Sequence, residues 1–343
     1  MRDYNLKFRK TEFLIVEGSE YARGFIVGKE MKKAIKKLII SFDRLTDKKQ
    51  KIVKKLDKLL EKDYLPLKQE IQGRADGAGV NYIDLLSNFA TDSFKEHCTS
   101  IMISKNGEKF LAHNEDGEIC EDNIRFVWAK YNDSEFKEIC YADGLSGGSI
   151  LVRKNFIFSI NYIWFKDNDI NDKYLPYRIY SGLLANCTNA KELFEVVKSH
   201  HISTAIGINL YDYETNKMFY IEKVLNKYLI KEVDGVNVHT NHLLQKDFKQ
   251  YVPSFEGDFK YSNTYMRQLI AEELIKKEMF FNAQVLKNIL MYYGTCDYNS
   301  VFSKGNFGYP ALTFCTFIFD AKNDKLVAHV HNKNLDIVDF SLK

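Results

Sequence analysis

Proline and long apolar runs are scarce in this sequence. The 343 residues include only four prolines, and no proline-rich, glycine-rich or repetitive segment marks a linker between separate domains. No apolar stretch reaches the roughly 18 residues that a membrane-spanning helix needs. The first residues offer only "FLIV" where a secretory signal needs a longer apolar core. We therefore expect a soluble, cytoplasmic protein without integral membrane association, folded as one interwoven domain.

An excess of charge of one sign is also missing. The 49 basic residues against 46 acidic ones give a net charge of +3, too small for the broad positive surface that nucleic-acid binding requires. The lysine-rich segment from Met31 to Asp63 is interleaved with acidic residues and is typical of a solvated helix face. We expect a small-molecule partner and no nucleic acid, and we leave a homo-oligomer open.

The cysteines show neither the density of a disulfide scaffold nor the close spacing of a metal site. There are six of them in the whole chain, and we expect them to be thiols. They are Cys98, Cys120, Cys140, Cys187, Cys296 and Cys315.

The apolar pattern changes near Cys98. From about Ser19 to Ser93 the apolar residues recur at helical spacing, and Asn81 is placed to cap the last of these helices. After Cys98, short segments rich in β-branched and aromatic residues predict strands. Helical stretches that separate these strands into groups lie near residues 174–185, 190–200, 263–277 and 282–292.

A hairpin is predicted in "CTSIMISKNGEKFLAHNEDG". Asn106 and Gly107 both tolerate the positive φ of a two-residue type I′ turn, and apolar strands flank them. With these two residues as the loop, the pairing places Cys98 opposite Glu115 and makes Asp116 its near neighbour. The hairpin therefore brings a thiol and a carboxylate together.

A thiol beside a carboxylate needs a separate proton acceptor. The negative neighbour disfavours the thiolate, which is the reactive form of cysteine. One solution is to cut the chain before the cysteine, so that its own α-amine, with a pKa near ~8, becomes the base. The carboxylate then orients that amine.

This region resembles the processing site of the acyl-coenzyme A:isopenicillin N acyltransferase family. Its members are N-terminal-nucleophile (Ntn) hydrolases, which are made as precursors and cut themselves before a cysteine. Cys98, Thr99, Asn114 and Asp116 match the family's cysteine–threonine and Asn-x-Asp motifs. The segment "VHTNHLLQ" is similar to the family's His-Thr-Asn-His segment, and this likeness makes Asn241 the oxyanion-hole side chain.

The resemblance implies an α+β fold, an αββα sandwich of the Ntn hydrolase type, and the groups of strands and helices agree with it. Residues 1–97 would form a helical leader, or α chain, packed on a main domain of residues 98–343. In the implied mechanism, Cys98 attacks the amide or thioester carbonyl of a small acyl substrate, and water or an amine then removes the acyl group. Asp116 positions the α-amine, and Asn241 with a backbone N–H stabilises the oxyanion. No cofactor is implied, although acyl-coenzyme A is a candidate substrate.

Further residues are assigned to the site by the same resemblance. Tyr162 in "SINYIWF" and His239 in the second motif are candidates to line or support the substrate pocket. Thr99 and Asn114 are candidates for supporting roles beside the nucleophile. Tyr309 stands where the family carries an arginine and is a candidate substrate contact.

Two departures from the family pattern leave alternatives open. The predicted cleavage lies between His97 and Cys98, where the best-known member has glycine before the nucleophile, and Tyr309 replaces the arginine. An uncleaved, catalytically silent member that binds an acyl ligand or a protein partner is one alternative. A papain-like thiol hydrolase, in which His239 serves Cys98 as a separate base and no chain cleavage occurs, is another.

Two pairings of histidine also suit metal ligands. His239 with His242, and His113 with Glu115, have ligand types that transition metals accept. Neither pair has a convincing third ligand in the sequence, so we predict no metal.

Overall fold

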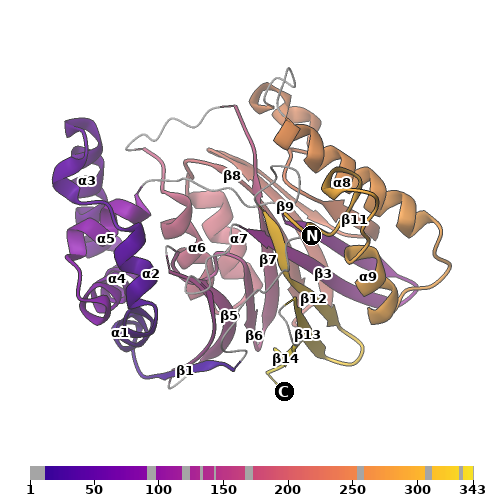
Figure 1. Cartoon of the computed structure of the whole chain (residues 1–343), viewed down its shortest axis with the longest axis horizontal. Coiled ribbons are helices and arrows are strands. Elements are labelled where there is room, and N and C mark those ends of the chain that lie inside the picture. The colour runs from indigo at the N-terminus through magenta and orange to yellow at the C-terminus, as the bar shows by residue number, and fades with distance from the viewer. Residues whose placement is uncertain are drawn as a thin grey trace.

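Two β-sheets lie face to face, and helices cover the outer face of each (Figure 1). The computed structural model describes residues 12–90, 98–117, 124–131, 134–142, 144–166, 173–252, 259–305, 311–331 and 335–342. The eight-stranded sheet contains, in spatial order, β1 (Leu14–Glu17), β4 (Ile124–Lys130), β5 (Glu135–Tyr141), β6 (Ile150–Arg153), β7 (Phe156–Ile163), β8 (Ala205–Asp212), β9 (Lys217–Val224) and β10 (Lys227–Glu232). The six-stranded sheet contains β11 (Gly235–His239), β2 (Thr99–Lys105), β3 (Glu108–Gly117), β12 (Leu312–Asp320), β13 (Lys325–Val330) and β14 (Ile337–Asp339).

The helices form two separate outer layers (Figure 1). The layer on the eight-stranded sheet contains α1 (Glu20–Glu30), α2 (Lys32–Leu38), α3 (Asp47–Asp63), α4 (Leu65–Ala78), α5 (Tyr82–Phe89), α6 (Tyr177–Asn186) and α7 (Ala190–Ser199). The layer on the six-stranded sheet contains α8 (Phe259–Lys276) and α9 (Ala283–Leu290). Among the described helices, none combines the length and apolar character needed to cross a bilayer.

Separate apolar clusters hold the layers together. Between the sheets, Met102 and Leu111 of the six-stranded sheet pack with Phe126 and Ile157 of the eight-stranded sheet. A larger cluster packs the helices α1 through α7 against the outer face of the eight-stranded sheet. Another cluster packs α8 and α9 against the six-stranded sheet. Each large apolar side chain buried in this way contributes roughly 1.5–3 kcal/mol to the hydrophobic stabilisation. The layers confirm the predicted α+β fold and the αββα sandwich.

The N-terminal helices α1 and α4 cross with their backbones in contact, because glycines line both of them. A Cβ atom on Gly24 would lie 2.0 Å from the carbonyl oxygen of Glu70, and one on Gly73 would lie 2.1 Å from a carbonyl oxygen of α1. Gly28 and Gly77 repeat this contact one turn further along. No larger residue fits at these positions without moving a helix.

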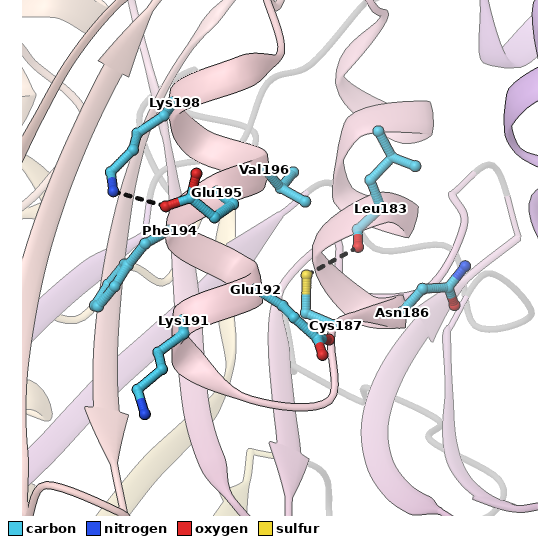
Figure 2. Close-up of a pocket in the computed structure, with 9 residues that line it drawn as sticks. All are labelled: Leu183, Asn186, Cys187, Lys191, Glu192, Phe194, Glu195, Val196 and Lys198. Carbon is cyan, nitrogen blue, oxygen red and sulfur yellow. Dashed lines mark hydrogen bonds and ion pairs between the residues drawn. The ribbon is translucent and has the colours of Figure 1, made fainter.

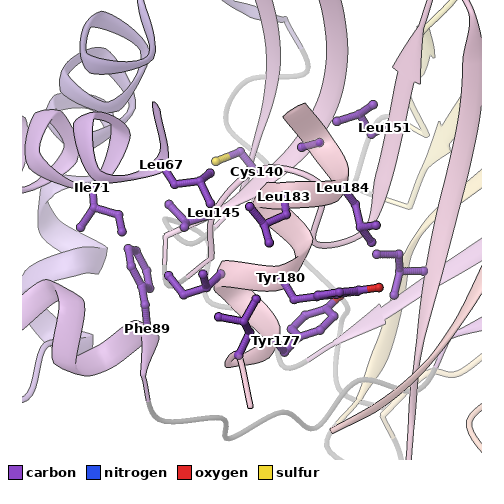
Figure 3. Close-up of a cluster of buried hydrophobic side chains, with 14 of the residues drawn as sticks. Leu67, Ile71, Phe89, Cys140, Leu145, Leu151, Tyr177, Tyr180, Leu183 and Leu184 are labelled. Carbon is purple, nitrogen blue, oxygen red and sulfur yellow. The ribbon is translucent and has the colours of Figure 1, made fainter. Parts of the chain in front are cut away.

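These helices share their core with the rest of the chain. Figure 3 shows Leu67, Ile71 and Phe89 from α4 and α5 beside Leu145 and Leu183. The strand β1 also joins the eight-stranded sheet, where it pairs in parallel with β4. The described residues before Cys98, 12–90, are therefore packed into the same core as those that follow it.

A buried ion network crosses the same boundary. The guanidinium of Arg23 in α1 pairs with Glu70 in α4 and lies 3.4 Å from the carboxylate of Glu138 in β5. Arg74 in α4 pairs with the same Glu70 and donates a 2.9 Å hydrogen bond to the carbonyl oxygen of Tyr141. Because an unpaired charge is costly to bury, these pairings fix α1 and α4 against β5.

The sequence predicted most of these elements. The side chain of Asn81 accepts a hydrogen bond from the backbone N–H of Ile83, which confirms the predicted cap of α5. The prediction missed β1, β5, β10 and β14. β1 and β14 are only four and three residues long, and β5 and β10 carry several charges, so their sequences show a weak strand pattern.

Candidate active site

The predicted hairpin is present as β2 and β3, with the predicted register. Both residues of the Asn106–Gly107 turn have positive φ, 54° and 81°. Thr99 pairs with Asn114, so Cys98, directly before β2, stands opposite Glu115 by the same register. The turn chemistry therefore fixes which β3 residues can meet the cysteine.

Side chains along β3 alternate between the two faces of its sheet. His113 and Glu115 point toward the eight-stranded sheet, whereas Asn114 and Asp116 point toward α8 and α9. The Sγ atom of Cys98, a ring nitrogen of His113 and a carboxylate oxygen of Glu115 all lie within 4.8 Å of one another. All three residues are buried. The thiol therefore faces an imidazole and a carboxylate inside the sandwich.

Hydrogen bonds from the eight-stranded sheet hold the Glu115 carboxylate. The hydroxyl groups of Tyr141 and Ser149 both donate to it. The His113 ring nitrogen Nε2 lies 2.8 Å from its Oε2 atom. These three contacts fix the orientation of the carboxylate beside the thiol.

A second chain of hydrogen bonds holds the other side of the His113 ring. Its Nδ1 atom lies 2.7 Å from the Ser100 hydroxyl, which donates a 2.7 Å hydrogen bond to Oδ1 of Asn161. The Asn161 amide is itself oriented, because its Nδ2 donates to the carbonyl oxygen of His239 and its Oδ1 accepts from Asn209. The ring is therefore held between the two sheets.

Asp116 lies on the strand adjacent to Cys98, as predicted, but it is not the nearest carboxylate to the thiol. One residue step along β3 turns it to the opposite face, toward Arg267 in α8. Burial raises the pKa of the Asp116 carboxyl to about 7, and the positive charge of Arg267 limits the rise. The nearby Thr313 hydroxyl also limits the rise, but neither carboxylate oxygen has a well-formed hydrogen bond among the described residues. A buried carboxyl group in this state lacks a donor.

Arg267 joins the two sequence motifs. Its Nη1 atom donates to the carbonyl oxygen of Cys98 at 2.9 Å and to the Thr99 hydroxyl at 2.7 Å. Its Nη2 atom donates to Oδ1 of Asn241 at 2.6 Å. The guanidinium is almost fully buried, and its Nε donates to Asn263 on the preceding turn of α8. Asn241 therefore reaches the surroundings of Cys98, as predicted.

The sequence reasoning missed Arg267, although its position carried a signal. Residues 263, 267, 271 and 275 recur at a spacing of four and are all buried, so Arg267 lies in the same stripe as Ala271 and Ile275. An arginine inside the buried stripe of a helix is costly unless it is paired. Such a position is a stronger indication of function than an arginine on a polar face.

Asn241 is held on both sides of its side chain. Its Nδ2 donates a 2.7 Å hydrogen bond to the carbonyl oxygen of Tyr162, and its Oδ1 accepts from Arg267. Its backbone N–H donates to the hydroxyl of Thr264 in α8. The amide therefore has one orientation, and its nitrogen carries a second hydrogen.

His239, the base of the papain-like alternative, does not belong to the group around the thiol. Its ring packs on Gly207, and its Nε2 lies 3.0 Å from the carbonyl oxygen of His242. Burial and, to a smaller extent, the positive charge of Arg267 lower the pKa of His239 to about 4, while the contact with the His242 carbonyl opposes the shift. A histidine with so low a pKa is a weak base at neutral pH, which argues against that alternative.

The other predicted site residues have varied positions. Asn114 ties β3 to α9 through a 2.8 Å hydrogen bond to the carbonyl oxygen of Leu290. Strand alternation turns the Tyr162 ring to the face opposite Asn161, where it packs edge-on against Trp164 and Tyr177. The hydrogen bond from Asn241 goes to the backbone carbonyl oxygen of Tyr162 and not to the ring. The predicted residues that lie outside the described part of the chain are His97 and Tyr309.

The third ligand missing from the His113 and Glu115 pairing is supplied in space by Cys98. Thiolate, imidazole and carboxylate are ligands that zinc accepts. Both ring nitrogens and the carboxylate already take part in the hydrogen bonds described above. The contacts therefore describe a proton network, and we assign no metal to it.

A pocket of about 730 Å³ opens on the outer surface, away from this group. It lies between α6 and α7, and its lining residues do not include Cys98, His113 or Glu115 (Figure 2). Cys187 in this pocket donates a hydrogen bond to the carbonyl oxygen of Leu183 at 3.4 Å, and burial raises its thiol pKa to about 12. A thiol with so high a pKa is a poor nucleophile.

A profile of the family described as acyl-coenzyme A:6-aminopenicillanic acid acyl-transferase matches residues 103–334. This range covers more than half of the chain and includes Asp116, Asn241 and Arg267, while Cys98 lies just before it. No curated protein matches the chain at a significant level.

Several solved structures are similar to this chain. One is a mutant of conjugated bile acid hydrolase from Clostridium perfringens, with 15% identity and a TM-score of 0.44, covering 71% of this chain and 92% of that chain. Another is the Caenorhabditis elegans ortholog of N-acylethanolamine-hydrolyzing acid amidase, with 16% identity and a TM-score of 0.46, covering 65% and 92%. A different variant of the same bile acid hydrolase has 14% identity and a TM-score of 0.43, covering 71% and 92%.

Proposed function

The chain belongs to the acyl-coenzyme A:6-aminopenicillanic acid acyl-transferase family, and we propose that it is an amidohydrolase or acyltransferase with Cys98 as nucleophile. The observation that supports this best is the buried guanidinium of Arg267. It contacts both the Cys98 carbonyl and the Asn241 side chain, which come from the two separate motifs. The substrate would be a small acyl compound with an amide or thioester bond.

We propose that the chain first cuts itself between His97 and Cys98. The released α-amine of Cys98, with a pKa near ~8, then accepts the thiol proton. Asp116, a buried carboxyl group that lacks a donor, would accept a hydrogen bond from this amine. Cleavage would thus supply Asp116 with a donor that the described residues do not provide.

The same proposal assigns the oxyanion to Asn241. One amide hydrogen of Asn241 is donated to the carbonyl oxygen of Tyr162, and this contact fixes the side chain. The second hydrogen would be donated to the oxyanion that forms when the Cys98 thiolate attacks. Donors of this kind contribute on the order of 100-fold to 1000-fold in rate.

The acyl-enzyme has two proposed fates. Water releases the acid and gives hydrolysis, whereas an amine accepts the acyl group and gives transfer. Cys98 carries the acyl group in both reactions, and neither requires a cofactor. Acyl-coenzyme A is one candidate acyl donor, since its thioester is the type of bond that a thiolate attacks readily.

Intact mass and a substrate screen test the proposal. The wild-type chain should yield one piece that ends at residue 97 and one that begins with Cys98, and Cys98→Ala should stay whole. The cut wild type should release acid from short acyl amides or thioesters, and Cys98→Ala should not. A wild-type chain that stays whole after prolonged incubation would overturn autoprocessing; His97→Gly would then show whether the bulky residue is the block.

A further inference from the structure

The uncut chain has no α-amine at Cys98, so its thiol needs another proton acceptor before the cut. We propose that His113, held by Glu115, is that acceptor, so that Cys98, His113 and Glu115 act together in the uncut chain. This inference rests on the proposed role of Cys98 as nucleophile. It gives the hairpin a second base, distinct from the α-amine that Asp116 would hold later.

The three side chains lie close together inside the sandwich. The thiol, one ring nitrogen of His113 and one oxygen of Glu115 lie within 4.8 Å of one another, and all three residues are buried. Register and alternation place them there, because Cys98 stands opposite Glu115, and His113 shares the face of Glu115. A cysteine, an imidazole base and a carboxylate that orients the base are the parts of a thiol hydrolase triad.

Hydrogen bonds on the Ser100 side of the ring assign the proton at Nδ1. Ser100 has one hydroxyl hydrogen, which it donates to Oδ1 of Asn161. The Asn161 amide orientation is fixed because its Nδ2 donates to a backbone carbonyl oxygen. Toward His113, Ser100 can therefore act only as an acceptor, which assigns a proton to Nδ1 of the ring.

The other ring nitrogen also faces an acceptor. Nε2 of His113 lies 2.8 Å from Oε2 of Glu115, and the Tyr141 and Ser149 hydroxyls donate to the same carboxylate. These donors leave the carboxylate to act as an acceptor toward the ring. Both nitrogens of the ring thus face acceptors, which is the arrangement that suits an imidazolium. The network stabilises the ring after it has taken a proton from Cys98.

The proposed cut moves one proton through His113 and passes through a thioester. The Cys98 thiol gives its proton to Nε2 of His113, and the thiolate attacks the carbonyl carbon of the preceding peptide bond. The carbon–nitrogen bond breaks, His113 returns the proton to the Cys98 nitrogen, and a thioester remains. Water then hydrolyses this thioester and leaves a carboxyl group on residue 97 and a free thiol and amine on Cys98.

Other ionisable groups surround the trio from several elements. The Tyr141 hydroxyl in β5 donates to Glu115, and Cys315 in β12 pairs with Glu115 on the neighbouring strand. Arg267 in α8 lies on the far face of the sheet, where it contacts the Cys98 carbonyl. The titration of the thiol is therefore measured in the intact chain, where these groups are present.

The experiment measures the rate of Cys98 alkylation by iodoacetamide against pH. Trypsin releases residues 96–105 from uncut chains and residues 98–105 from cut chains, so peptide mass reports the thiol of each form separately. The variants are His113→Gln and Glu115→Gln. The control is His329→Gln, a half-buried histidine on β13 of the same sheet.

Both variants should move the midpoint of the uncut-chain profile upward, by about 1 to 3 pH units, and slow self-cleavage. The control should leave the profile unchanged. Glu115→Gln is the decisive variant, because the two possible roles of Glu115 predict opposite movements of the midpoint. If Glu115 only repels the thiolate, its neutralisation lowers the midpoint; if it holds the imidazolium, its neutralisation raises the midpoint.

A midpoint that stays in place or moves downward in Glu115→Gln overturns the proposal, as does an unchanged profile in His113→Gln. If these buried variants do not fold, Ser100→Ala takes their place. It removes the acceptor at Nδ1, together with the hydrogen bond from Ser100 to Asn161, and leaves His113 and Glu115 in place. It should give a smaller upward movement of the midpoint, and no movement would overturn the proposal. A wild-type profile that changes on addition of EDTA would indicate a metal at these groups and would also overturn it.

The proposed function fails separately from this inference. A wild-type chain that neither cuts itself nor turns over amides would end the proposed function. The alkylation profile of that same uncut chain would still decide whether His113 and Glu115 take the proton of Cys98.

Discussion

Arg267 in α8 donates a 2.6 Å hydrogen bond to Oδ1 of Asn241, which follows the end of β11. The same guanidinium holds the carbonyl oxygen of Cys98. One planar cation therefore sets the distance between the proposed nucleophile and the proposed oxyanion donor. A flexible ammonium group cannot hold both oxygens in this fixed geometry.

Arg267→Lys should accordingly lower both self-cleavage and turnover by about 10- to 100-fold, the loss expected when one or two charged hydrogen bonds are removed. Gel densitometry measures the cut, and steady-state kinetics measure turnover. Arg153→Lys is the control. Arg153 is also buried, and two of its guanidinium nitrogens donate to the carbonyl oxygen of Ala185, which is not part of the candidate site. Equal losses in both variants would show that any buried arginine has this effect.

Asn241→Ala should lower the turnover number by about 100-fold or more and change KM little, because the oxyanion exists mainly in the transition state. Initial rates on cut material separate the two parameters. Asn155→Ala, which removes an exposed amide bound to Thr188, is the matched control. A raised KM with an unchanged turnover number would instead make "HTNH" a substrate-binding or structural segment.

Asp116 should make the stability of the uncut chain depend on pH. Its folded pKa of about 7 lies above the ordinary 3.8, so the folded chain keeps a proton that the unfolded chain releases. The free energy of unfolding should therefore fall as pH rises from about 4 to about 7, by about 4 kcal/mol from this group. Asp116→Asn, made in the uncut Cys98→Ala chain, should flatten this part of the curve.

Denaturant unfolding at several pH values measures that difference. The parent Cys98→Ala chain is the control, because every other group is the same. If the parent and the Asp116→Asn chain lose stability equally between pH 4 and pH 7, Asp116 is ionised throughout this range. The carboxyl would then have a donor already, and the amine would not be needed to supply one.

Gly24→Ala should destabilise the chain by about 1 to 3 kcal/mol or more, because the new Cβ would lie 2.0 Å from a backbone oxygen of α4. Thermal or denaturant unfolding measures the loss. Gly148→Ala is the control, since a Cβ there would meet its nearest atom at 3.7 Å. A loss of similar size at both positions would show that backbone freedom, and not the helix contact, sets the cost.

The hairpin was predictable because its information is local. The Asn106–Gly107 turn fixes the register of the strands on either side, and the register brings Cys98 to Glu115. The same register made Asp116 a near neighbour of Cys98, but it did not decide which face of the sheet each side chain takes. The sequence paired His113 with Glu115 only as candidate metal ligands, and their common position beside the thiol followed once alternation was combined with the position of the second sheet.

The remainder depends on contacts between distant segments. Arg267 lies 169 residues after Cys98, and no spacing rule connects the two. The edge strands β1 and β10 form because a sheet already offers a partner, and their own sequences prefer a strand only weakly. Tertiary context therefore decided both the last strands and the buried cation.

The separation of Cys98 and Arg267 along the chain also sets the time that passes between the synthesis of the two residues. A ribosome that adds about 5–20 residues per second needs roughly ten to thirty seconds to travel the 169 residues between them. The thiol hairpin is thus complete long before its guanidinium leaves the ribosome. If the proposed cut requires Arg267, an uncut nascent chain marks a molecule whose C-terminal half has not yet arrived, and the cut reports that folding is finished.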